Sequence, residues 1–160
     1  MAVDMFLELD GVKGESKDED HKGKIDILSW NWVVTNTGDL HSGGGGGAGK
    51  ADIGDIVVTK YLDLSTADLL KCCVSGKHIA KGKLIVRKAG SKALDYLVIE
   101  LEEVMVTQVS PGGSAAGDRV TETLQLGFSK FTLTYKEQTE KGAGGPSATV
   151  GFNVSANKLS

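Results

Sequence analysis

Val120–Gln138 reads VTETLQLGFSKFTLTYKEQ and is the longest uninterrupted strand-like stretch of the chain. Leu124 and Leu126 alternate with polar residues, and the alternation resumes one residue out of phase at Phe131. Because strand side chains alternate between two faces, a shift of one residue exchanges those faces. A β-bulge returns both halves to one core, so we predict a single long bulged strand. The alternative is two strands joined by a tight turn, for which Ser129-Lys130 is a poor sequence.

Strand-like segments also lie on both sides of this stretch, and several change parity partway along. Leu97 to Val106, for example, changes parity across Glu102-Glu103. The other segments are residues 3–9, 25–34, 53–62, 84–88 and 148–156. One short helix is predicted, with Ser65 as its N-cap and Gly76 as its C-terminal stop. This pattern predicts a mainly β fold, either an all-β barrel or a packed pair of antiparallel sheets, in which repeated bulges supply the curvature.

Composition limits the class of protein. The chain has 160 residues, 40% hydrophobic and 24% charged, with a net charge of −3, which predicts one globular domain spanning residues 1–160. Without a basic stripe we expect no nucleic-acid binding, and without a long apolar run we expect no membrane insertion. Met1 to Phe6 lacks the pattern of a cleaved leader. We therefore expect the chain to start in the cytoplasm and any export to need no signal peptide.

No catalytic, metal or cofactor site is predicted. Cys72 and Cys73 are adjacent, so they are interpreted as reduced thiols, at least one of them buried. Ser16 and Asp18 lie near His21, but these sequence neighbours lack an oxyanion-binding feature and favour a capped turn over a catalytic triad. We therefore expect a protein that is not an enzyme.

A glycine tract, GGGGGAGK at residues 43–50, interrupts the pattern of strands. Gly44 to Lys50 matches the spacing of a phosphate-binding loop. Ala51 stands where that motif needs Ser or Thr, and the sequence that follows is strand-like rather than helical, so we reject this function. The tract is typical of a long hairpin loop, and loops of this length usually contact another molecule.

Several sequence blocks together resemble the Hcp family, the tail-tube proteins of the type VI secretion system. The resemblance extends over nearly the whole chain and depends on the combination and order of the blocks. They are Gly14-Glu15-Ser16 with Asp18, His21, Ile25 and Ile27; Trp30 and Trp32; the glycine tract; Thr59-Lys60-Tyr61-Leu62-Asp63 with Ser65; Ser75-Gly76-Lys77-His78-Ile79; Val86-Arg87-Lys88-Ala89-Gly90; Tyr96-Leu97; and Phe128-Ser129-Lys130 with Tyr135.

The resemblance implies a fold and a function. It implies a β-barrel of two packed antiparallel sheets with one short α-helix on its side, similar to phage tail-tube proteins. It also implies hexameric rings that stack into a tube inside a contractile sheath. Spike proteins of the same apparatus are implied as further partners. Such tubes are secreted, and their lumen carries and protects small effector proteins. No cofactor is implied.

The family also suggests roles for individual residues. Ser29 and Asn31 alternate with Trp30, so we assign the indole to the core and the polar pair to the lumen. The alternative is that this polar pair faces solvent on the outside of the ring. The loop from Thr37 to Lys50 resembles the family's extended loop that reaches the adjacent ring. Its candidate inter-ring residues are Gly43, Gly44, Gly45, Gly46, Gly47, Gly49 and Lys50.

Two lysines are further candidates for contacts between rings. Lys50 and Lys60 would form ion pairs with acidic residues of the next ring, such as Asp18 or Glu19. A different class of function also stays open, namely a monomeric β-barrel that binds a small ligand.

Overall fold

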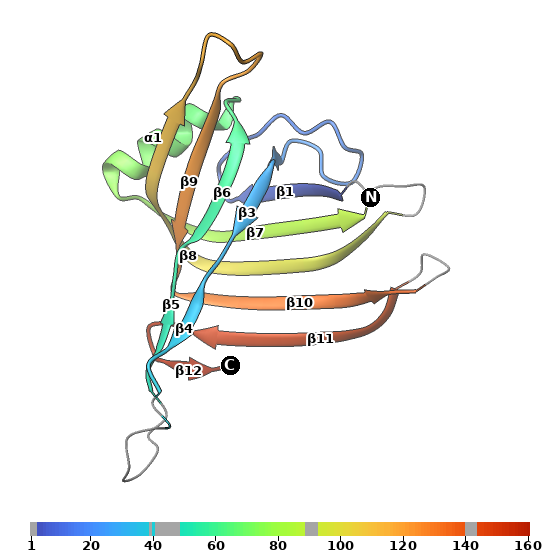
Figure 1. Cartoon of the computed structure of the whole chain (residues 1–160), viewed down its shortest axis with the longest axis vertical. Helices are drawn as coiled ribbons and strands as arrows, with labels where there is room; N and C mark the ends of the chain where they lie inside the picture. The colour runs from blue at the N-terminus through green and yellow to red at the C-terminus, as the bar shows by residue number, and fades with distance from the viewer. Residues whose placement is uncertain (1–2, 39, 41–48, 89–92, 140–143) are drawn as a thin grey trace.

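The computed structural model describes residues 3–38, 40, 49–88, 93–139 and 144–160. It is mainly β with one short helix, as predicted (Figure 1). The elements are β1 (Val3–Leu9), β2 (Ile25–Asp26), β3 (Ser29–Asn31), β4 (Val34–Asn36), β5 (Ala51–Ile53), β6 (Ile56–Tyr61), α1 (Ser65–Ser75), β7 (His78–Lys88), β8 (Leu94–Gly112), β9 (Thr121–Gly127), β10 (Lys130–Gln138), β11 (Gly144–Asn153) and β12 (Lys158–Leu159).

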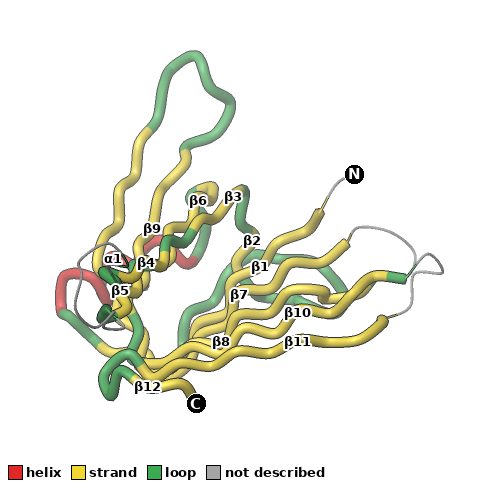
Figure 2. Tube along the Cα trace, turned by 60° about the horizontal axis from the view of Figure 1, so that its bottom comes forward, coloured by secondary structure: helices red, strands yellow, loops and turns green. Residues whose placement is uncertain are grey.

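The long strand β8 belongs to two layers of the molecule. Its first half pairs with β7 on one side and with β10 on the other, and its second half pairs with β9. β1 and β11 extend the first layer, whereas β6 and β3 extend the second. Figures 1 and 2 show that the two layers run in different directions and meet along β8.

The predicted change of faces occurs where the layers meet. On β8 the buried positions are odd-numbered up to Leu101 and even-numbered from Val104 onward. Between them, the backbone φ of Glu103 is 53°. A positive φ in a residue with a side chain marks a local break in a strand. The predicted shift across Glu102-Glu103 is therefore confirmed.

The stretch Val120–Gln138 changes faces at the same level. β9 and β10 both pair with β8, and no register shift separates them. Gly127 lies opposite Met105, and three residues on Lys130 lies opposite Glu102. The chain keeps its direction, so the tight-turn alternative is wrong. The ladder is interrupted between the two strands, which are therefore separate elements rather than one long strand.

The hydrophobic core lies between the two layers. Leu7, Leu84 and Ile99 point inward from the first layer, and Ile56 and Leu124 point inward from the second. All of them are almost fully buried. Each such side chain stabilises the fold by about 1.5–3 kcal/mol relative to an exposed one, so this core holds the layers together.

The sheet does not close into a barrel, and in this detail the expected fold is wrong. Among the described residues β2 pairs only with β1, and β3 pairs only with β6. Single hydrogen bonds continue the connection, because the Ile27 N–H donates to the Met5 carbonyl at 3.1 Å and the Leu28 N–H donates to the Thr59 carbonyl at 2.8 Å. The segment between β2 and β3 therefore bridges the two layers without forming a continuous ladder.

The helix α1 differs from the prediction at its start. Leu64, not Ser65, occupies the N-cap position, and the Asp63 carboxylate accepts the Ser65 N–H at 2.9 Å. Gly76 ends the helix in the left-handed conformation, as predicted. Cys72 is buried against the core, also as predicted. Within the described residues no helix has the length and apolarity that crossing a membrane requires.

Candidate functional site

The outer face of the second layer carries a row of hydroxyl groups across four strands. Ser29 on β3 lies opposite Thr59 on β6. Thr59 in turn lies opposite Thr123 on β9, and Thr123 lies opposite Ser110 on β8. Residues directly opposite in a sheet and on one face are neighbours. Ser29, Thr59, Thr123 and Ser110 therefore form one row, called the hydroxyl row below.

A second row runs beside the first. Asn31 on β3 lies opposite Val57 on β6. Val57 in turn lies opposite Gln125 on β9, and Gln125 lies opposite Gln108 on β8. These four residues are called the amide row, although Val57 is apolar. The hydroxyl row and the amide row together form the neutral face, because none of their side chains is ionisable.

The predicted parity of β3 is confirmed. Ser29 and Asn31 are exposed, whereas Trp30 and Trp32 are partly buried and pack against the core. Trp32 also donates its indole N–H to the Gly54 carbonyl at 2.8 Å. The indoles therefore anchor this segment and leave the polar pair on the outer face.

Charged groups border the neutral face at its two ends. The Arg119 guanidinium lies 3.8 Å from the centre of the Tyr61 ring, which is a cation–π geometry. At the other end, the Thr107 hydroxyl donates to the Asp55 carboxylate at 2.6 Å. The face thus runs from a cation, across uncharged polar groups, to an anion.

Two ionised side chains of the same strands point inward. Lys60 on β6 is 0% exposed and Glu122 on β9 is 1% exposed, and they form an ion pair. The Lys60 ammonium also lies 2.9 Å from the Asp63 carboxylate. Lys60 is therefore not available to an adjacent ring, and its predicted inter-ring ion pair is wrong.

This buried ion pair is connected to the start of α1. The Thr66 hydroxyl donates to Glu122 at 3.1 Å, and the Asp63 N–H donates to the Thr66 hydroxyl at 3.1 Å. The second Glu122 carboxylate oxygen has no hydrogen-bond partner. Lys60, Glu122, Asp63 and Thr66 therefore fix the helix to β6 and β9.

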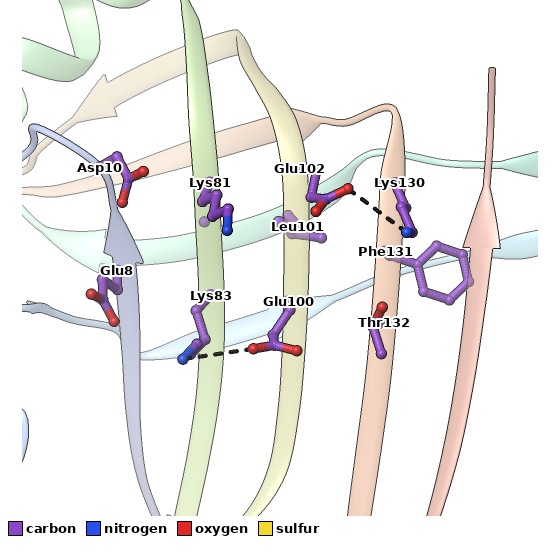
Figure 3. Close-up of a pocket in the computed structure, with 11 residues that line it drawn as sticks. Glu8, Asp10, Lys81, Lys83, Glu100, Leu101, Glu102, Lys130, Phe131 and Thr132 are labelled. Carbon is purple, nitrogen blue, oxygen red and sulfur yellow. Dashed lines mark ion pairs between the residues drawn. The ribbon is translucent and has the colours of Figure 1, made fainter. Parts of the chain in front are cut away.

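The outer face of the first layer has the opposite character. In one row Glu8 lies opposite Lys83, and Lys83 lies opposite Glu100, with its ammonium 3.8 Å from that carboxylate. In the next row Glu102 lies opposite Lys81 on one side and Lys130 on the other. The dashed lines in Figure 3 mark the Lys83–Glu100 and Lys130–Glu102 pairs. These six residues are called the charged face below.

One cation of the first layer is buried. Arg87 on β7 forms ion pairs with Asp18, Asp20 and Asp4. The hydrogen bond from Arg87 lowers the pKa of Asp18 below its usual 3.8. Because Asp18 is already paired within the chain, the predicted contact between Asp18 and a lysine of the next ring is not supported.

The segment around His21 is the predicted capped turn. Asp18 accepts the His21 N–H at 3.2 Å, and the Ser16 hydroxyl oxygen accepts the Asp18 N–H at 3.3 Å. The buried His21 ring lies 3.1 Å from the Asp95 carboxylate and 3.0 Å from the Lys24 ammonium. The polar groups hold the loop against the sheet and form no nucleophile–base pair.

β4 and β5 form a separate two-stranded ribbon that projects from one end of the molecule (Figure 1). Residues 33–38 and 49–53 are called the arm below. The Asn36 amide donates to the Gly49 carbonyl at 2.9 Å, and Lys50 continues into β5. A strand, β5, follows Lys50 as predicted, where a phosphate-binding loop would lead into a helix. Of the predicted loop residues, Gly43, Gly44, Gly45, Gly46 and Gly47 lie outside the described residues.

Gly49 has a steric role at the neck of the arm. A Cβ atom added there would lie 2.1 Å from the Gly38 nitrogen, so the two backbones approach too closely for a side chain. The Thr37 N–H donates to the Lys50 carbonyl at 3.4 Å across the same neck. Gly49 therefore allows the narrow neck that leads into the glycine tract.

Sequence reasoning found only part of these features. It identified Ser29 and Asn31 but missed the other neutral-face residues, because cross-strand register cannot be read from one strand. The buried pair had a signal that was overlooked: Lys60 shares parity with Ile56 and Val58. Among the described residues, no group of His, Cys, Asp or Glu side chains is placed to hold a metal ion.

Comparison with known proteins gives consistent results. The family described as "Type VI secretion system effector, Hcp" matches residues 6–135. The chain is 48% identical over 160 residues to "Protein hcp1" of Pseudomonas aeruginosa PAO1, covering 98% of each chain. A solved "Structure of a type six secretion system protein" has a TM-score of 0.94 at 28% identity, covering 99% of this chain and 100% of that one. Hcp1 from Salmonella typhimurium has a TM-score of 0.84 at 36% identity, with both chains fully covered.

Proposed function

The chain belongs to the Hcp family of type VI secretion system proteins, and we propose that it builds the inner tube of that system as hexameric rings. In this proposal, residues 1–160 act as one structural unit rather than as an enzyme. The rings stack inside the contractile sheath and behind the spike proteins. Family membership and the close structural similarity to Hcp1 from Salmonella typhimurium support this role.

The neutral face is the observation that supports a cargo-carrying lumen. Ser29, Asn31 and their cross-strand neighbours form a broad surface that can donate and accept hydrogen bonds without carrying charge. Charged groups discriminate strongly between partners by attraction and repulsion. An uncharged polar wall binds effectors of different charge weakly, so they can be held and later released. We therefore assign the neutral face to the lumen.

The arm is the proposed contact between stacked rings. Gly49 and Lys50 lie at its neck, and the tract Gly43–Gly47 continues from it. A two-stranded ribbon alone is marginally stable in water, so it gains stability when it packs against another surface. The adjacent ring supplies that surface in this proposal.

The proposed location follows from the same role. Before firing, the protein resides in the bacterial cytoplasm, where rings assemble into tubes. Firing then carries it out of the cell as part of the tube. Membership of a family of type VI secreted proteins supports this route.

The assembly is tested on the purified protein. Light scattering should give a mass of about six chains, and negative-stain electron microscopy should show rings with a central channel. A hexameric ring is a closed heterologous assembly, so discrete particles of one size are expected. A monomer at micromolar concentration would contradict the tube proposal and favour the alternative, a monomeric β-sheet protein that binds a small ligand.

The lumen assignment is tested at Asn31. Asn31→Arg places a charge on the neutral face and should reduce co-purification of effectors, while ring formation by light scattering stays unchanged. Asn31→Ser is the matched control, because it keeps the position polar and uncharged and should retain effectors. If Asn31→Arg retains effectors as well as Asn31→Ser does, the assignment of this face to the lumen is wrong.

A further inference from the structure

Val57 is the one apolar side chain of the neutral face. It is half-buried on β6 and lies in the amide row between Asn31 on β3 and Gln125 on β9. Burial of apolar surface is favourable because it removes that surface from water. Val57 is therefore the position at which this polar face can gain free energy from an apolar contact. A single apolar residue on a surface is common, however, and does not by itself indicate a binding site.

The two amides beside Val57 supply a second observation. The Asn31 side chain is exposed and the Gln125 side chain is half-buried. Within the part of the chain that the structure describes, neither carboxamide forms a hydrogen bond with the protein. A carboxamide offers a carbonyl acceptor and N–H donors, which match the two polar groups of a peptide bond. Both amides are therefore available to bind the main chain of another polypeptide.

The spacing of these side chains fits an extended segment. Asn31, Val57 and Gln125 lie side by side on β3, β6 and β9, which are neighbouring strands (Figure 1). Because neighbouring strands lie about 4.8 Å apart, the two amides are separated by roughly 9–10 Å. An extended chain advances about 3.3 Å per residue, so about three residues span that distance. The middle residue of such a segment then lies over Val57.

We propose that Asn31, Val57 and Gln125, called the Val57 site below, bind an extended, uncharged segment of an effector protein. An apolar side chain of the segment contacts Val57, and the two amides bind the peptide groups on either side of it. This inference rests on the proposed function, in which the neutral face lines the lumen. It deepens that function, because Val57 determines which side chain is preferred while the amides accept any sequence. An apolar contact flanked by a few polar groups is typical of ligand sites.

The Val57 site also accounts for reversible binding. One side-chain contact is weak, but a ring of identical chains presents the same site once in each chain. Several weak contacts to one effector reinforce one another, although each can break separately. Effectors can therefore be retained by a ring and still be released from it.

Uncharged tripeptides test the site on the purified protein, with binding followed by saturation-transfer NMR titration. Wild type should bind acetyl-Gly-Phe-Gly-amide about tenfold more tightly than acetyl-Gly-Ser-Gly-amide, as partial burial of an apolar side chain predicts. Val57→Thr has nearly the same shape but adds a hydroxyl group, and it should abolish most of this preference. Val57→Ile should keep it.

The matched control for Val57→Thr is Val150→Thr. Val150 is 43% exposed on β11, outside the neutral face, so this variant should keep the preference for the Phe peptide. Light scattering of each variant verifies that the state of assembly is unchanged. Equal preference in Val57→Thr and Val150→Thr overturns the proposal.

The amides are tested by a different readout. Gln125→Ala should weaken binding of both tripeptides by the same factor, about fivefold for one lost hydrogen bond, and leave the preference for Phe unchanged. Gln108→Ala is the matched control, because Gln108 ends the same row but is not a neighbour of Val57. If Gln125→Ala binds both tripeptides as tightly as Gln108→Ala does, the amide does not bind the main chain and the proposed site is wrong.

These results separate the further inference from the proposed function. Wild-type rings that bind both tripeptides equally would overturn the Val57 site but leave the tube function intact. A wild-type protein that forms no rings contradicts the tube function, whatever the tripeptides show.

Discussion

The two layers of the molecule place their charged side chains on opposite sides. On the first layer Lys83 and Glu100 point outward to form the charged face, and Ile99 points into the core. On the second layer the outward residues are uncharged, and the ions Lys60 and Glu122 point inward. The neutral face therefore does not reflect a lack of charged residues on these strands, because the charges are present but buried.

Stability alone does not account for this difference. Removing two ions from water carries a desolvation cost that can exceed their mutual attraction. Outward-facing charges, as on the first layer, avoid that cost. An uncharged polar surface is useful where effectors of different charge must be held weakly and later released, which is the role proposed for this face.

The largest expected effect comes from removing the buried cation. Lys60→Met leaves Glu122 and Asp63 without their ammonium partner, which should lower the free energy of unfolding by about 3–5 kcal/mol. Urea denaturation at one fixed protein concentration measures the change, because assembly also contributes to apparent stability. Lys83→Met on the charged face is the matched control and should lose at most about 1 kcal/mol.

The double variant Lys60→Met/Glu122→Leu sharpens the test. It removes both members of the buried pair and should recover much of the lost stability, since only Asp63, whose carboxylate still accepts the Ser65 N–H, is left without the ammonium. Equal stability of Lys60→Met and Lys83→Met would contradict the contrast between the two layers.

Much of the fold follows from alternation in the sequence. Val3–Leu9 was predicted at its observed bounds, and the change of faces near Glu102-Glu103 and again before Phe131 was predicted from parity alone. Parity also indicated the buried ion pair, because Glu122 lies on the inward side of β9 together with Leu124. It was missed because lysine and glutamate are rarely fully buried unless they are paired.

Other features depend on how distant strands meet. The hydroxyl row requires the register of β3, β6, β9 and β8, and a single strand does not determine its neighbours. Closure of the barrel was expected but depends on whether the short β2 and β3 pair continuously. The hydrogen bond from the Leu62 N–H to the Val120 carbonyl likewise joins residues that lie far apart in the sequence. Such placements come from topology rather than from local pattern.

An intermediate effect is expected at Arg87, which is buried although the charged face of the same layer is exposed. Its hydrogen bond lowers the folded-state pKa of Asp18, so this carboxylate stabilises the fold above its unfolded pKa near 3.8. The contribution is lost as pH falls through the folded-state pKa. Asp18→Asn should therefore be less stable than wild type by a constant amount from about pH 7 to about pH 5, and the difference should narrow progressively as pH falls below about 4.

The pH dependence is measured by urea denaturation at each pH. Glu19→Gln is the matched control. It removes a neighbouring carboxylate that does not pair with Arg87. A difference between wild type and Asp18→Asn that does not narrow at all as pH falls below about 4 would mean that the loss of stability does not come from the negative charge of Asp18.

The smallest effect is expected on the charged face itself. Lys83→Gln, Glu100→Gln and their double variant form a thermodynamic cycle for a pair whose atoms lie 3.8 Å apart. Both side chains are substantially exposed, so the coupling should be about 0.2–1 kcal/mol and should fall further in about 1 M salt. A coupling as large as that of the buried Lys60–Glu122 pair and insensitive to salt would contradict this. It would mean that another copy or another protein covers the charged face, and the contrast between an open charged layer and a protected neutral layer would no longer hold.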